Sequence, residues 1–327
     1  MKQITQYGSI DLTDLSNKPH EIIMPTIIAD CGKSTCCRFI EFFTVNIRNL
    51  NTRKAYYRAV VYFLNWCGAR GIKFEEIGPM VVAAYIEQHT ASPPTVKQHL
   101  AAIRMLFDWL VVGHIIPVNP ALSVRGPKYV LKRGKTPILS KDETRMLLES
   151  IDISSVVGLR DRALIAIMVY SFARVGAVVG MRVGDYYKNG KRWWLRLHEK
   201  GGKFHEVPAH HKLEEYIDAY MNVSGLWEDR KGPLFRTVLG KSHRLTNNCM
   251  TPADVYRMIR RRAKQVGITT PIGCHTFRAI GITNYLENGG TLENAQILAA
   301  HTSPRTTKLY DRTGDKITLD EVERIVI

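Results

Sequence analysis

The stretch "LAAHTSPRTTKLYDR", Leu298 to Arg312, combines residue types that could carry out a chemical step. His301 precedes Tyr310 by nine residues, and Ser303-Pro304 predicts the cap and first position of a short helix that carries the tyrosine. A tyrosine hydroxyl is a weak nucleophile at neutral pH, since its pKa is about 10, so it needs a nearby base and a positive field. The stretch is therefore either a surface helix with an aromatic inner face or the site of a nucleophile.

Four polar residues upstream also occupy informative positions. Arg174 ends the most apolar helical segment, in "SFARVGA", where a charge is costly unless it is paired or faces a site. Lys200 lies at the tip of a predicted hairpin. His275 and Arg278, in "GCHTFRA", stand three apart at a predicted helix start and so share one face. Each residue alone has an ordinary structural explanation, and only their combined order favours a site.

The 327 residues are enough for two domains that must position these groups. We expect a lead-in over residues 1–30, a helical domain over 31–124, a basic linker over 125–137 and a second domain over 138–327. In the helical domain, Thr52 and Thr95 are predicted caps and Pro79 a predicted helix start. The apolar positions recur at a spacing of three to four, which predicts a small all-α bundle.

The second domain is predicted to mix helices with a little sheet. Ser140 and Glu143 form a capping box at its start. Alternating residues around Gly201-Gly202 predict a β-hairpin, and Thr318 with Glu321 predicts a second capping box on a C-terminal tail helix. Further helices are expected at about 158–172, 211–221, 252–267, 276–288 and 292–300.

The charge balance indicates a polyanionic partner. The chain has 46 Lys and Arg against 30 Asp and Glu, a formal net charge of +16, which favours nucleic acid over other partners. A membrane surface is the rival, but the longest apolar run, 163–173, is too short to span a bilayer. No apolar leader is visible in "MKQITQYGSIDLTDL". The six irregularly spaced cysteines are expected to be reduced thiols of a cytoplasmic protein.

The order of an arginine, a hairpin lysine, a His-x-x-Arg pair, a histidine and a tyrosine resembles the tyrosine recombinases, also called phage integrases. The resemblance covers nearly the whole chain. It implies a mainly α fold, with an α-helical N-terminal core-binding (SAM-like) bundle, which "NTRKAYYRAVVYFLNWC" resembles, and a mixed α+β catalytic domain with a small β-hairpin or sheet. It also implies a site-specific recombinase or integrase that cleaves and rejoins DNA through a covalent 3′-phosphotyrosyl intermediate. The catalytic residues that it implies are Arg174, Lys200, His275, Arg278, His301 and the nucleophile Tyr310.

Three positions depart from the usual family pattern. Phe172-Ala173 stands where the family usually has Gly-Leu before its first arginine, and Ala177 where an acidic residue usually follows three positions later. Ala299-Ala300-His301 replaces the usual Leu-Gly-His. These changes touch the support of the site and leave its six chemical groups in place.

DNA contact is expected from both sides of the linker, through phosphate-binding basic residues. A solvated basic surface is the alternative for each group. The expected contacts are Arg125, Lys128, Lys132, Arg133 and Lys135 in the linker, Lys203 in the hairpin, and Arg257, Arg260, Arg261 and Arg262 on one predicted helix.

The partners and alternatives follow from the resemblance. We expect double-stranded DNA, a cyclic homotetramer on paired sites in which C-terminal tails can be exchanged, room for an accessory DNA-bending or directionality protein, and a nucleoid-associated cytoplasmic location. The sequence has neither an acidic cluster that would bind Mg²⁺ nor a P-loop that would bind ATP, so we expect no cofactor. The alternatives are a type IB topoisomerase-like relaxing enzyme and a DNA-binding protein of the same fold with impaired catalysis.

Overall fold

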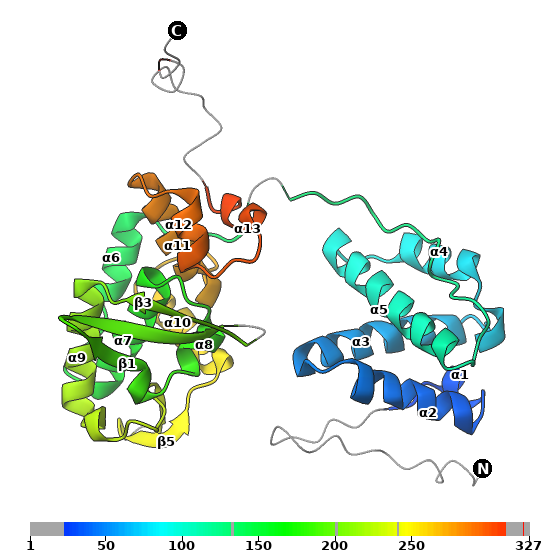
Figure 1. Cartoon of the computed structure of the whole chain (residues 1–327), viewed down its shortest axis with the longest axis horizontal. Helices are drawn as coiled ribbons and strands as arrows, with labels where there is room; N and C mark the ends of the chain where they lie inside the picture. The colour runs from blue at the N-terminus through cyan, green and yellow to red at the C-terminus, as the bar shows by residue number, and fades with distance from the viewer. Residues whose placement is uncertain (1–22, 132–133, 200–201, 241, 312–322, 324–327) are drawn as a thin grey trace. The chain divides into compact units, whose positions relative to one another are not determined.

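The structure, a computed structural model, divides the chain into two compact units, and the boundary falls between Val130 and Leu131. This division falls inside the segment predicted as the linker. The residues described are 23–131, 134–199, 202–240, 242–311 and 323 (Figure 1). The predicted tail helix with Thr318 and Glu321 lies outside them.

The N-terminal unit is an all-α bundle, as the sequence predicts. Its apolar stripes meet in one core, which includes Phe39, Phe63 and Leu106, all fully buried. Pro79 opens one helix, as expected, and two prolines open the longest one. The elements are α1 Thr26–Ala29, α2 Lys33–Glu41, the π-helical turn η1 Phe42–Asn46, α3 Leu50–Gly68, the 3₁₀ turn η2 Phe74–Glu76, α4 Pro79–Gln88 and α5 Pro93–Val112.

Three details of this unit differ from the sequence prediction. The lead-in was expected to run to residue 30, but Pro25 precedes α1, and Ile27 and Ile28 are buried in the bundle core. The domain therefore begins before residue 31. The cap of α3 is Asn49, whose side-chain oxygen accepts from the backbone N–H groups of residues 51 and 52. Thr52, the predicted cap, lies within the first turn instead. The N-cap of α5 is Ser92, and Thr95, the other predicted cap, likewise lies within the first turn.

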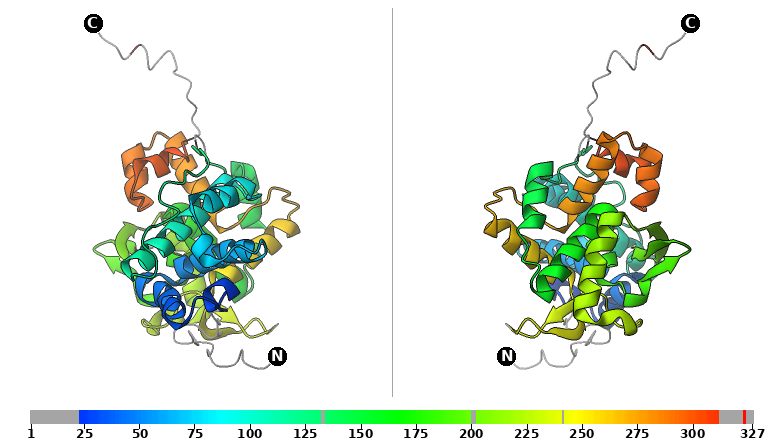
Figure 2. Two further views of the ribbon diagram at one scale, coloured as in Figure 1. Left: turned by 90° about the vertical axis from the view of Figure 1, so that its right-hand side faces the viewer. Right: turned by 90° about the vertical axis from the view of Figure 1, so that its left-hand side faces the viewer.

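The second unit is built around the buried helix α7. Helix α9 packs along one side of α7, as Figure 2 shows, and α11 packs against it as well. The capping box predicted at Ser140 and Glu143 is present at the start of α6. The helices and helical turns are α6 Lys141–Glu149, α7 Val156–Tyr170, α8 Val175–Val179, η3 Val183–Asp185, α9 His211–Ser224, η4 Leu226–Glu228, α10 Pro252–Gln265, α11 Cys274–Glu287, α12 Leu292–Leu298 and α13 Pro304–Lys308.

Two small antiparallel sheets complete this unit. The predicted hairpin joins β2 Arg192–Glu199 to β3 Lys203–Pro208, and β1 Tyr186–Asn189 extends it in the order β1-β2-β3. Strand β1 and the pair β4 Arg236–Val238 and β5 Leu245–Cys249 were not predicted, because they are short and lack a clear apolar alternation. Along β2 the buried positions are Leu195, Leu197 and Glu199, so one carboxylate shares the apolar face.

Candidate active site

Tyr310 follows α13 and is held by its backbone in a small apolar cluster. Its N–H donates to the Thr307 carbonyl at 2.9 Å, and the Thr283 hydroxyl donates to the Tyr310 carbonyl at 3.0 Å. The tyrosine is only 8% exposed and packs with Phe172 and Ala279. The elements α11, α12 and α13 that carry this cluster lie together in Figure 1. The buried neighbours restrict the ring, so the hydroxyl has a defined position.

His275 meets the hydroxyl of Tyr310. Its Nε2 lies 2.5 Å from Tyr310 Oη, from the first turn of α11. Burial lowers the pKa of His275, and the charges of Arg278 and Arg174 lower it further. Burial raises the pKa of Tyr310, while the same two arginines oppose that rise. At neutral pH the pair is therefore a neutral imidazole beside a protonated phenol, ready for a proton transfer.

Arg278 lies one helical turn after His275 and is 1% exposed. Its guanidinium donates to the backbone carbonyls of Phe172 and Ala299, the second at 2.6 Å. Burial, followed by the charge of Arg174, lowers the pKa of Arg278 to about 10, so the group stays charged at neutral pH. A fixed positive charge therefore lies close to Tyr310.

The two carbonyl acceptors of Arg278 belong to unusual backbone turns. Phe172 has φ 55° and Ala300, next to Ala299, has φ 46°. These are left-handed conformations that cost a non-glycine residue of order 1 kcal/mol or more. Both positions are among those where the family pattern usually has glycine. The chain therefore keeps the glycine-like turns with residues that fit them poorly, and each turn directs a carbonyl at Arg278.

Arg174 lies beside Glu199, a residue that the sequence analysis did not select. Arg174 Nη1 is 2.6 Å from Glu199 Oε2, and the Arg174 N–H donates to Glu199 Oε1 at 3.3 Å. The Arg174 side chain is 35% exposed, whereas that of Glu199 is 1% exposed. Arg174 is thus the guanidinium that solvent reaches. The sequence did contain a signal for Glu199: it alternates with Leu195 and Leu197 along one strand, and a carboxylate on that apolar face needs a partner.

His301 is the second histidine in contact with the tyrosine. Its ring stacks on that of Tyr310 with centroids 5.7 Å apart and an interplanar angle of 13°. His301 Nδ1 is 2.9 Å from the hydroxyl of Thr307, which is fully buried. Burial, with the charges of Arg278 and Arg174, lowers the pKa of His301 to about 3. His301 is therefore neutral at physiological pH.

The structure brings together five of the six predicted catalytic residues. Lys200 lies outside the described residues, as do Lys132 and Arg133, and the side chain of Lys203 is not described. The strand end that precedes Lys200 is placed by Glu199 against Arg174. Within the described ranges, no group of three or more His, Cys, Asp or Glu side chains is arranged to hold a metal ion.

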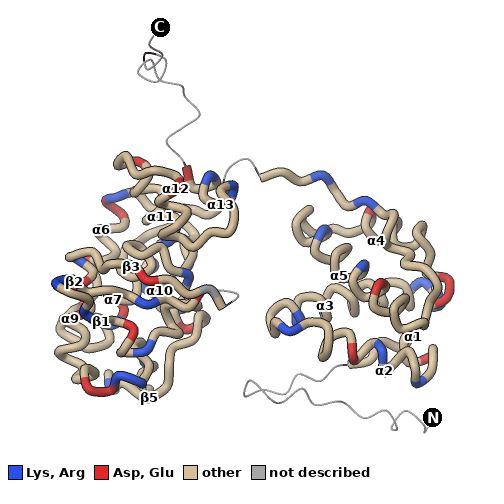
Figure 3. The backbone as a smooth tube through the Cα atoms, viewed as in Figure 1, with Lys and Arg blue, Asp and Glu red and all other residues tan. Residues whose placement is uncertain are grey.

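The predicted DNA contacts that the structure describes are exposed, with one exception. Figure 3 shows basic positions along both units. The exposed predicted residues are Arg125, Lys128 and Lys135 on the irregular segment after α5, and Arg257, Arg260 and Arg261 on α10. Arg262 differs from the expectation, because its side chain is 12% exposed and donates to Asp161 on α7 at 2.9 Å. Arg262 therefore anchors α10 to α7 and does not present its charge to solvent.

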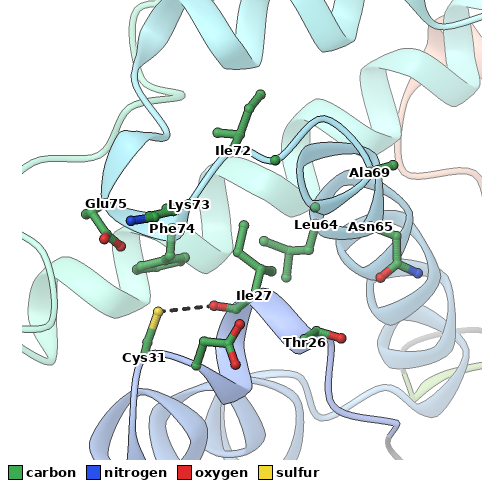
Figure 4. A pocket seen from close by; sticks show the side chains of 13 residues that line it. Thr26, Ile27, Cys31, Leu64, Asn65, Ala69, Ile72, Lys73, Phe74 and Glu75 are labelled. Atoms are coloured by element: carbon green, nitrogen blue, oxygen red, sulfur yellow. Dashed lines mark hydrogen bonds between the residues drawn. The ribbon is translucent and has the colours of Figure 1, made fainter.

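A pocket in the N-terminal unit shows no comparable chemistry. It opens between α1, the end of α3 and η2, and Figure 4 shows Cys31 and Glu75 at its edge. The Cys31 thiol donates to the Ile27 carbonyl at 3.1 Å, and burial raises its pKa. A thiol with a raised pKa is a poor nucleophile. All six cysteines are free thiols, and in the described part of the chain no helix is long and apolar enough to cross a membrane.

Comparison with known proteins identifies the family that the sequence resembles. The family model described as the phage integrase family matches residues 137–316, and that of its N-terminal SAM-like domain matches residues 38–113. Tyrosine recombinase XerD of Listeria monocytogenes serotype 4b is 27% identical over 282 residues, covering 83% of this chain and 91% of the relative. Tyrosine recombinase XerC of Salmonella typhi is 25% identical over 279 residues, covering 84% and 89%.

Solved structures share the fold. XerH site-specific recombinase bound to a palindromic difH substrate, in a post-cleavage complex, has a TM-score of 0.65 at 20% identity, covering 85% of this chain and 80% of that one. A lambda integrase tetramer bound to a Holliday junction has a TM-score of 0.62 at 19% identity, covering 89% and 82%.

Proposed function

This chain belongs to the phage integrase family of tyrosine recombinases, and we propose that Tyr310 is its nucleophile and that the groups around Tyr310 catalyse DNA strand cleavage and rejoining. The activity is site-specific recombination through a tyrosine. The single observation that carries the residue assignment is the 2.5 Å contact between Tyr310 Oη and His275 Nε2 beside two arginines.

In the proposed cleavage step, Tyr310 Oη attacks the phosphorus of a DNA phosphodiester. A bond forms between Oη and phosphorus, and the bond from phosphorus to the 5′ oxygen breaks. The phenolic proton moves to His275 Nε2, which accepts it because this imidazole is neutral. Lys200 is the proposed donor of the proton that the departing 5′ oxygen requires. The products are a 3′-phosphotyrosyl link and a free 5′ hydroxyl, and rejoining reverses the step.

The positive groups stabilise the charge that develops on the phosphate oxygens. Arg174 is partly exposed and meets the phosphate from solvent, whereas buried Arg278 contributes its charge from beneath. His301 is neutral, so when its Nδ1 accepts from Thr307 its Nε2 carries the proton and can donate to a phosphate oxygen. This chain's own residues thus supply the base, the charge and the donors, and the proposed mechanism uses neither a metal nor ATP.

The alternatives share parts of this site. A type IB topoisomerase-like enzyme would use the same phosphotyrosine chemistry, but the match of a SAM-like N-terminal domain and of recombinases over most of the chain favours exchange between sites. A DNA-binding protein with impaired catalysis would not need His275 against Tyr310 or two arginines beside them.

The proposed partners extend this function. Double-stranded DNA is the substrate, and lambda integrase on a Holliday junction is a tetramer, which supports a cyclic homotetramer for this chain. Exchange of C-terminal tails between protomers, an accessory DNA-bending or directionality protein, a mobile-element role and a nucleoid-associated cytoplasmic location remain predictions. The basic residues of α10 and of the segment after α5 would bind phosphates along the duplex.

A suicide duplex tests the proposal. Duplexes that the protein selects from a random pool supply its binding site, and a nick beside the scissile phosphate lets the 5′-hydroxyl fragment diffuse away. The wild type is expected to accumulate a covalent adduct, and Tyr310→Phe to bind the same duplex and form none. Binding without an adduct in the wild type would favour the impaired-catalysis alternative.

A further inference from the structure

Glu199 is a buried carboxylate that bridges the two arginines of the site. At the end of β2, its Oε2 lies 2.6 Å from Arg174 Nη1, and its Oε1 accepts from the Arg174 N–H. Oε1 is also 3.9 Å from Arg278 Nη1. A carboxylate with a side chain 1% exposed is costly unless each oxygen has a partner, and both oxygens here face the catalytic arginines.

The arginines need such a partner because they repel each other. The charge of Arg174 lowers the pKa of Arg278, and the charge of Glu199 opposes that effect. Helix α8, which follows Arg174, offers only the methyl group of buried Ala177 at the position where the family usually has an acid. Among the described residues, Glu199 is the only acid within ion-pair distance of Arg174 or Arg278.

We propose that Glu199 is a positioning residue that holds the guanidinium groups of Arg174 and Arg278 in the arrangement that binds the scissile phosphate. The inference rests on the proposed function, since it assigns the two arginines to the phosphate. Glu199 fixes both the side chain and the backbone N–H of Arg174, and its Oε1, 3.9 Å from Arg278 Nη1, balances the charge of Arg278. In this chain the acid beside the arginines thus comes from strand β2 of the hairpin, whereas the usual family position for it lies on α8, after Arg174.

Single-turnover cleavage of the suicide duplex tests this role. Glu199→Gln keeps the size of the side chain but removes its charge, and should slow adduct formation by about a hundredfold, the scale expected for misplaced catalytic groups. Glu199→Asp keeps the charge on a shorter arm and should recover part of the rate. The matched control is Glu206→Gln on β3, which breaks an ion pair with Arg196 on the same sheet and should cleave at the wild-type rate.

Two further readouts separate positioning from other roles. The affinity for the duplex should change little in Glu199→Gln, because only one phosphate of the site is affected. A duplex with sulfur in place of the scissile 5′ oxygen releases a thiolate, which needs no protonation, and Glu199→Gln should remain slow on it. Restoration of the wild-type rate on that duplex would assign Glu199 to proton delivery and overturn the proposal.

Other outcomes would also overturn it. A wild-type cleavage rate for Glu199→Gln would show that Glu199 has no role in the chemical step. If Glu199→Gln and Glu199→Asp lost the same thermal stability as each other and the same cleavage rate, the role of Glu199 would be purely structural. These results differ from failure of the proposed function, which would appear as absence of an adduct in the wild type or its persistence in Tyr310→Phe.

Discussion

His275 and Tyr310 lie 35 residues apart in the chain, yet Nε2 of the histidine is 2.5 Å from the tyrosine hydroxyl. The contact joins the start of α11 to the residue that follows α13. It links the proposed base, whose pKa is lowered, to the proposed nucleophile, whose pKa is raised, both chiefly by burial. Proton transfer between them therefore has to accompany attack, because a free phenolate is rare at neutral pH.

The pH dependence of cleavage follows from this pair. His275 acts as a base only when it is neutral, and its pKa lies below the ordinary value of 6.5. At pH 6.5 the single-turnover rate should therefore exceed half of its plateau value, with no rise up to pH 9 from ionisation of Tyr310. A rate already halved at pH 6.5 or above, with DNA binding unchanged, would contradict this. His275→Gln should lose the acidic limb and about 10²- to 10⁴-fold in rate.

His301 should make folding sensitive to acid. Its folded-state pKa of about 3 lies below the unfolded value of 6.5, so the unfolded chain binds more protons between these pH values and stability falls as pH falls. One such group contributes a slope of up to about 1.4 kcal/mol per pH unit. His301→Gln should reduce the slope for the second unit by about that amount between pH 6 and 4, measured by urea unfolding. Equal slopes in the two proteins would show that His301 titrates normally.

The left-handed residue Ala300 is a site for stabilisation. With φ at 46°, alanine is strained where glycine is not. Ala300→Gly should therefore raise the free energy of unfolding by about 0.5–1 kcal/mol. Phe172→Gly is the contrasting variant, because Phe172 shares the positive φ but packs against Tyr285. Loss of the Phe172 ring should lower the free energy of unfolding by about 3 kcal/mol. A destabilised Ala300→Gly would mean that the methyl group contributes more than the strain costs.

The arginines of α10 should separate into two classes. Arg257 and Arg260 are exposed, and replacing each with glutamine should reduce the slope of log affinity against log salt by about 1. Arg262→Gln should instead lower stability, since it breaks the ion pair with buried Asp161. Unchanged salt slopes in both exposed variants would remove α10 from the DNA interface.

The sequence predicted most of the longer helices and the β2–β3 hairpin because these elements depend on local signals. Caps, proline starts and helical periodicity located α4, α6 and α7, and the order of the catalytic residues pointed to one family. Glu199 was missed because its importance depends on where β2 ends relative to Arg174, a tertiary fact. The ion pair of Arg262 was missed for the same reason, since its partner Asp161 lies 101 residues away in the chain. Short strands such as β4 carry too few residues for a pattern to emerge.

The most direct test of the central claim is peptide mapping of the trapped protein–DNA adduct by mass spectrometry after nuclease and protease digestion. The account predicts one phosphotyrosyl nucleotide, attached to the peptide that contains Tyr310, through the 3′ end of the cleaved strand. Attachment to another residue, or through a 5′ phosphate, would contradict it.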